Sequence, residues 1–183
     1  VSLNAEGTDN SDRLVPTELG QACAAIRGDN ELWLGLSLMS AEFDELDPHH
    51  LAAACAALVT EVSRPDSWTH YSLSPEVLAP LDNLQKGLRR RLFQVQYRHE
   101  AAIPIWLERD LVTLVEQWAL GVEWLEMISH TSLDEGDVVR ILRRTLDFLS
   151  QSPHVPHVSD AVRSNAYRSM QLIDRFPVNE AAS

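Results

Sequence analysis

The sequence predicts an all-α fold, an irregular bundle of roughly six to eight helices joined by short loops. Apolar residues recur at three- and four-residue spacing through most of the chain, which is the period of a helix with one buried face. No segment alternates at period two and no Asn-Gly hairpin signal occurs, so strands are not expected. The 183 residues, of which 45% are hydrophobic, are enough to enclose one core.

The chain divides into three parts by composition. Residues 1–16 are polar and contain Gly, Asn and Pro, so we expect a flexible lead-in. Residues 17–175 carry the helical periodicity and form the predicted domain, without an internal repeat. Residues 176–183 form a short C-terminal tail.

The first helices are predicted from their start signals. Either Asp29 or Asn30 can cap a helix over residues 31–39. The pair Asp47-Pro48 places a cap residue before a proline at the first helical position, where its missing N–H costs nothing. We expect the helix that begins there to end at the Pro-containing stretch 64–67.

The longest periodic run begins at Ser74-Pro75, which repeats the same start signal. It predicts a helix to about Glu100, followed by a break at Pro104. Its apolar stripe consists of Val77, Leu78, Leu81, Leu84, Leu88, Leu92 and Val95.

The C-terminal half predicts four further helices. They cover residues 111–118, 124–128, 133–149 and 159–174. Gly121 suits the position just past the first of these helices, where a left-handed backbone is common. Residues 150–156 contain two prolines and are expected to form a loop.

The net charge of −12 restricts the partners of the chain. Free-standing nucleic-acid binders usually have a basic balance, because release of counterions drives their affinity. Any contact with nucleic acid must therefore come from a local basic patch on an acidic body. Lys86 is the only lysine, so such patches consist mainly of arginine.

The compartment is predicted from cysteines and hydropathy. Cys23 and Cys55 lie in alanine-rich helical runs and are expected to be buried thiols, which suits a reducing environment. No apolar run approaches the roughly 18 residues of a membrane span, and no secretory leader is recognised. We expect a cytoplasmic protein.

Catalytic motifs are not found in the sequence. A phosphate-binding G-x-x-x-x-G-K stretch followed by Ser or Thr is absent, as is a G-x-S-x-G elbow. The acidic stretch 44–47 precedes a helix start and is interpreted as a charged loop. Three histidine-containing pairs, His49/His50, Glu126/His130 and His154/His157, are expected at the surface, and no metal site is predicted.

Three arginines stand out near the C-terminus. Arg140, Arg143 and Arg144 fan over roughly 100 degrees of the helix, opposite its apolar stripe. They form either a solvated face paired with Asp137 and Asp147 or a contact for an anion or nucleic acid.

A second basic cluster lies on the long helix and is interpreted as an exposed, solvated face balanced by Glu100 and Glu108. It consists of Lys86, Arg89, Arg90, Arg91 and Arg98.

The stretch 135–144, EGDVVRILRR, resembles the corresponding stretch of the DSHCT domain, which closes the C-terminus of superkiller and exosome-associated RNA helicases. Three further stretches resemble motifs of the same domain in the right order, namely residues 17–34, 47–61 and 116–124. Together they cover about residues 17–175. The stretches AIRGDNELWL and IDRFP are most similar to the cyanobacterial and plastid branch of the family. The C-terminal tail lacks the apolar ending of many family members.

The resemblance implies an accessory domain without its own catalytic centre. Such a domain rests on two RecA-like domains and a winged helix of the same chain, and it lines the path by which single-stranded RNA leaves, in some cases toward a nuclease. ATP and magnesium belong to the RecA domains of the parent helicase, and no cofactor is expected here. Arg144 and Glu61 occupy the RNA-facing positions, with Arg140 and Arg143 as supporting contacts. The alternative is a protein-interaction or interdomain docking module whose arginines pair with carboxylates.

Overall fold

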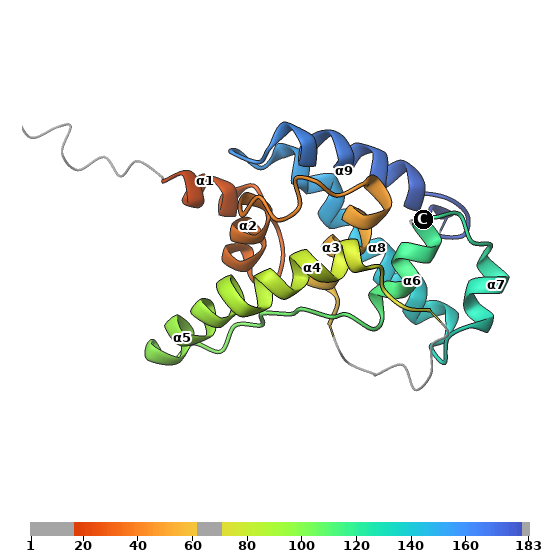
Figure 1. Ribbon diagram of the computed structural model, residues 1–183, viewed down its shortest axis with the longest axis horizontal. Coiled ribbons are helices and arrows are strands. Elements are labelled where there is room, and N and C mark those ends of the chain that lie inside the picture. Colours follow the sequence, from red (N-terminus) through yellow and green to blue (C-terminus); the bar gives the residue numbers. More distant parts are fainter. Residues whose placement is uncertain (1–16, 62–70, 181–183) are drawn as a thin grey trace, which may run out of the picture.

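The computed structural model describes residues 17–61 and 71–180 (Figure 1), and this part of the chain is helical without a β-strand. The α-helices span Glu18–Ala24 (α1), Glu31–Met39 (α2), Pro48–Val59 (α3), Pro75–Leu84 (α4), Arg90–Arg98 (α5), Val112–Ala119 (α6), Trp124–Ser129 (α7), Glu135–Gln151 (α8) and Asp160–Ile173 (α9). A π-helical turn, Gln85–Arg89 (η1), joins α4 to α5, and a 3-10 turn, Ser152–His154 (η2), follows α8. The predicted all-α bundle is confirmed.

The helix starts follow the predicted signals. Asn30, rather than Asp29, caps α2, because its side-chain oxygen accepts a hydrogen bond from the backbone N–H of Trp33. Pro48 and Pro75 occupy the first turns of α3 and α4. The predicted stop at 64–67 lies outside the described residues, as does the lead-in 1–16, and α3 itself ends at Val59. The expected loop 150–156 is partly helical, since α8 runs to Gln151 and η2 follows it.

Helix α3 lies at the centre of the bundle. It packs against α4, α6, α8 and α9 (Figure 1). Its residues 51–58 are all buried. Five of these eight residues are alanine, so the surrounding helices approach the α3 backbone closely. The one core of the described chain is thus organised around a helix that is apolar on all sides.

The segment α4–η1–α5 forms one continuous helix that extends beyond the body of the bundle (Figure 1). The chain then returns along it in an extended conformation. Two side chains of the helix hold this return, because Arg89 Nε donates to the carbonyl of Ile105 at 2.8 Å and Gln96 Nε2 donates to that of Ile103 at 2.9 Å. We call residues 85–105 the arm.

The C-terminal segment closes the bundle. The side chain of Val178 is 1% exposed, so residues after α9 contribute to the core. Arg175 lies with its guanidinium carbon 3.5 Å from the ring centroid of Trp118 and donates to the carbonyl oxygens of Trp118 and Val122. Gly121 adopts φ +98° just past α6, as its predicted role at the helix end requires.

None of the helices in ranges 17–61 and 71–180 is long and apolar enough to cross a bilayer.

Candidate nucleic-acid interface

Helix α8 carries the three arginines that the sequence singled out. Asp134 caps its start by accepting from the backbone N–H of Asp137. One face of α8 is fixed in the core by Val138, Leu142 and Leu149. The register of the arginines relative to the rest of the domain therefore follows from the packing of α8.

Arg144 is the best-placed of the three for recognition. Its guanidinium lies 3.3 Å from Asp29 Oδ2 and 3.9 Å from Glu61 Oε2, and its side chain is 39% exposed. The Arg144 guanidinium carbon is also 5.4 Å from the ring centroid of Trp106. The structure thus brings Arg144 and Glu61 together although 83 positions separate them in the sequence, and it adds two partners.

A pocket of about 160 Å³ opens beside Arg144. Asp29, Trp33, Pro104 and Trp106 contribute to its wall, which combines aromatic surface with polar groups. Its volume is below the range of about 300 Å³ and more that is typical of small-molecule sites. The pocket is therefore suited to one inserted group rather than to a whole cofactor.

Arg140 and Arg144 share a second, smaller hollow of about 50 Å³ with Glu61. Arg140 is held by Asp137 at 3.0 Å, and 68% of its side chain is exposed. A pair so exposed contributes little to stability, because water screens both charges. The guanidinium of Arg140 is consequently available to a partner with only a small cost for breaking this pair.

Arg143 does not belong to the same surface. Its Nε and one terminal nitrogen both lie 3.3 Å from the backbone carbonyl of Val178, to which they donate. The three arginines were expected to share one face of the helix, but Arg143 and Arg144 are partly buried and have different surroundings. Arg143 instead links α8 to the C-terminal segment, a contact over 35 positions that periodicity cannot predict.

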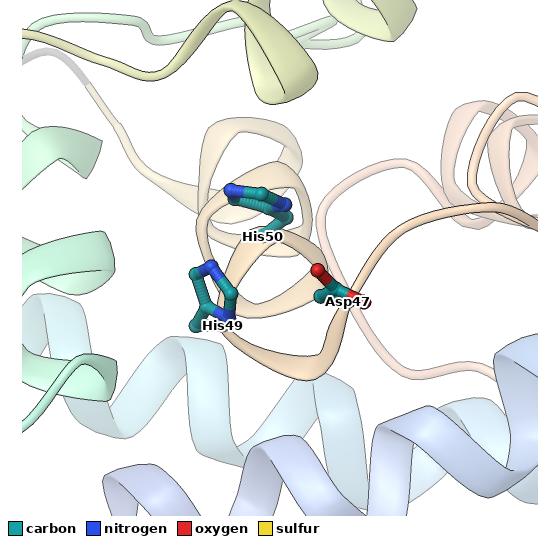
Figure 2. A group of neighbouring side chains, drawn as sticks. All are labelled: Asp47, His49 and His50. Atoms are coloured by element: carbon teal, nitrogen blue, oxygen red, sulfur yellow. The ribbon is translucent and has the colours of Figure 1, made fainter.

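The histidines near the start of α3 form the one group of potential metal ligands found in the described part of the chain. Figure 2 shows His49 and His50 at the N-terminal end of α3, with Asp47 just before it, and the potential ligand atoms lie within 4.8 Å of one another. His50 was expected at the surface, yet its side chain is only 12% exposed and its Nε2 is 3.7 Å from the buried carboxylate of Glu116. This contact gives His50 a structural role, and the absence of a metal here stays a prediction.

The cysteines are less uniform than predicted. Cys55 is fully buried in α3, and burial raises the pKa of its thiol. Cys23 is only partly buried in α1, so the expectation of two buried thiols is correct for Cys55 alone.

Two residues of the Arg144 site were missed by sequence reasoning. Asp29 was considered only as a helix cap, and Trp106 was not considered at all. Both reach Arg144 through packing between distant segments. An aromatic residue two positions after the break at Pro104 is a weak signal, since such residues more often fill a core.

The fold and this site define a helical-bundle domain with an arginine set between carboxylates and a tryptophan. The chain belongs to the DSHCT (NUC185) domain family, whose model matches residues 13–181. This bears out the resemblance found in the sequence motifs.

Three curated relatives that resemble the chain are named as ATP-dependent RNA helicases. The chain is 37% identical, over 90% of its length, to a protein of Arabidopsis thaliana named DExH-box ATP-dependent RNA helicase DExH15 chloroplastic. It is 29% identical over 81% of its length to the DExH-box ATP-dependent RNA helicase DExH10 of the same plant. It is 25% identical over 81% of its length to the ATP-dependent RNA helicase mtr4 of Schizosaccharomyces pombe. The chain spans only 14%, 15% and 13% of these relatives, respectively.

Proposed function

We propose that this chain is the accessory C-terminal domain of an ATP-dependent RNA helicase and contacts single-stranded RNA as it leaves the RecA ring. The relatives are named as such helicases, and the matched region is a small part of each. In this proposal, ATP and magnesium bind to RecA-like domains elsewhere in the parent protein. Those domains and a winged helix are the partners within the parent protein, and a nuclease that receives the RNA is the further partner.

The convergence of Arg144, Glu61 and Trp106 is the observation that carries the proposal. A guanidinium has five N–H donors, so Arg144 keeps donors for a base or phosphate while it contacts Asp29 and Glu61. The exposed Glu61 carboxylate can accept from an exocyclic amine of a base. Trp106 supplies an aromatic wall beside Arg144.

The other two arginines have lesser roles in this proposal. Arg140 supports the contact from the neighbouring hollow. Arg143 acts indirectly by fixing the C-terminal segment against α8, because its donors are directed to the carbonyl of Val178.

An Arg144→Gln substitution tests the proposal. It removes the charge and the charge-assisted hydrogen bonds while keeping a polar, although shorter, side chain. We expect RNA binding by the parent helicase to weaken about tenfold, which corresponds to about 1.4 kcal/mol, with RNA unwinding lowered in parallel. The measurement is an unwinding assay with fluorescence anisotropy of labelled single-stranded RNA.

Arg168→Gln is the matched control, because Arg168 is an exposed arginine on α9 away from this site. It should leave both activities unchanged. Unaltered unwinding and binding by the Arg144 variant would contradict the proposed RNA contact.

The second candidate function is a docking module without RNA contact. It is favoured by the pairing of Arg140 with Asp137 and of Arg144 with Asp29 and Glu61 inside the domain. Arg143, which donates to a carbonyl instead, departs from this pattern. Under this alternative, Arg144→Gln would weaken association with the RecA-like domains without changing the affinity for RNA.

A further inference from the structure

The arm carries a concentration of positive charge that is unusual for this acidic chain. Residues 83–99 contain five cationic side chains and no Asp or Glu, while the whole chain has a net charge of −12. The sequence predicts that Glu100 and Glu108 balance this cluster. Glu108 is instead buried and accepts from the backbone N–H groups of Asp110 and Leu111.

Within the described residues, none of these five cations forms an ion pair with a carboxylate. Four of the five are exposed, namely Lys86, Arg90, Arg91 and Arg98. Arg89 is the exception in exposure, because it is partly buried and bonds to Gln85 and Ile105. The uncompensated charge thus lies at the surface of the arm.

Large aromatic side chains are exposed on the same helix. The side chain of Tyr97 is 87% exposed and that of Phe93 is 45% exposed. Arg89 lies over the Phe93 ring, with its guanidinium carbon 4.7 Å from the centroid. These two exposed rings do not fill the core, so the ring of Tyr97 and the part of the Phe93 ring that Arg89 does not cover are available to a partner.

Three of the cations and both rings line one groove of about 930 Å³ between the arm helix and the returning chain. The three cations are Lys86, Arg89 and Arg90. Lys86, Arg90, Phe93 and Tyr97 are separated by four, three and four residues, so they follow one stripe of the helix. Ala101, Ile103 and Ile105 contribute to the opposite wall. The groove lining contains no carboxylate.

We propose that the groove of the arm binds single-stranded nucleic acid, with Lys86 and Arg90 at phosphates and with Phe93 and Tyr97 stacked on bases. Surfaces that bind single strands without sequence preference combine these two elements, a basic track and aromatic platforms. A partner protein with an acidic surface would satisfy the cations but would leave the stacking faces of both rings unexplained.

This surface is separate from the Arg144 site but adjoins it. Pro104 contributes both to the pocket beside Arg144 and to the groove of the arm. Asn30 connects the two regions, since its amide nitrogen lies 3.0 Å from the carbonyl of Pro104. A nucleic-acid strand that binds to one surface can therefore continue along the other. The binding proposed for the arm does not require Arg144.

The test is fluorescence anisotropy of a labelled oligoadenylate RNA of about 12 nucleotides, titrated with this chain across a salt series. Replacing Lys86 and Arg90 by Gln removes two phosphate contacts. The slope of log affinity against log salt should then become less steep by about 1.4. Tyr97→Ala removes one stacking platform and should weaken binding about five- to 150-fold.

Matched controls exist on α9, where Tyr167 and Arg168 are also exposed. Tyr167→Ala and Arg168→Gln should bind as the unchanged chain does, and circular dichroism verifies that every variant is folded. Equal losses in the control and arm variants would overturn the proposal by showing diffuse binding. So would full affinity in the arm variants, or no binding of RNA at low salt by the unchanged chain.

An Arg144→Gln variant in the same titration separates the two proposals. If the arm variants lose affinity for RNA and the Arg144 variant keeps it, RNA binding by the arm is supported and the RNA contact of Arg144 is contradicted. The opposite result overturns the arm proposal, and the arm would then be a protein-docking surface.

Discussion

His49 shows how packing changes the chemistry of one side chain. Partial burial of the imidazole lowers the pKa of His49, and the neighbouring His50 lowers it further. The carboxylates of Asp47, Glu116 and Glu76 act in the opposite direction but are smaller influences. The folded chain therefore favours the neutral ring, whereas the unfolded chain protonates it near the ordinary value of about 6.5.

A pH dependence of stability follows from this shift. Below about pH 6.5 the unfolded state binds more protons at His49 than the folded state, so this residue reduces stability as the pH falls. We expect His49→Gln to diminish the loss of melting temperature between pH 7 and pH 5, measured by thermal denaturation. His99→Gln, at an exposed position after α5, is the control. An unchanged pH profile in the His49 variant would contradict this role.

The candidate site could be predicted only in part at this scale. Arg144 and Glu61 were chosen from the resemblance to the DSHCT domain, and the structure places them 3.9 Å apart. Asp29 and Trp106 could not be found, because their contacts with Arg144 depend on the packing of separate segments. For the same reason the link from Arg143 to Val178 was not predicted.

At the scale of elements, the end of α6 depends on a residue distant in sequence. Arg175 donates to the carbonyls of Trp118 and Val122, which flank the turn at Gly121. Helix C-termini carry carbonyls without intrahelical partners, and a cation there satisfies them and opposes the helix dipole. Partial burial also lowers the pKa of Arg175, which remains far too high for the group to lose its charge.

We expect Arg175→Ala to destabilise the domain by about 1–3 kcal/mol, through loss of hydrogen bonds from a charged donor and of the contact with Trp118. Urea denaturation measures this difference. Arg168→Ala, on the exposed face of α9, should change stability by no more than about 0.5 kcal/mol. Equal effects of the two substitutions would exclude a special role for Arg175.

Most elements could be predicted, because their signals are local. Proline at the first turn marks the starts of α3 and α4, and the glycine at position 121 marks the end of α6. The π-helical turn η1 could not be predicted, since the apolar stripe of the long helix continues on both sides of it. The 3-10 turn η2 was missed because two prolines favour a loop equally well.

For the whole molecule, the central position of α3 was the main feature that sequence reasoning did not identify. The helical periodicity of the sequence predicted one buried face for this helix. The structure buries the intervening alanines as well, because α4, α6, α8 and α9 surround the helix. Alanine occurs on buried and exposed helix faces alike, so a run of alanines does not indicate how many neighbours a helix has.

This arrangement predicts cooperative unfolding. Because four helices pack on α3, none of them can detach or unfold without exposing part of the same core to water. Trp33 in α2 and Trp118 in α6 are both 1% exposed, so tryptophan fluorescence reports on separate parts of that core. We expect its transition in urea to coincide with that of the far-ultraviolet circular dichroism.

Ala54→Leu tests the central role of α3. Ala54 is fully buried, and a larger side chain there forces the surrounding helices apart at a cost of about 1–3 kcal/mol. Both transitions should move together to lower urea concentration. Ala161→Leu, at an exposed position of α9, should leave them within about 0.5 kcal/mol of the unchanged chain. Helices that share one core unfold together, so both transitions should shift by the same amount. A shift of the fluorescence transition alone would show that the helices around α3 form more than one cooperative unit.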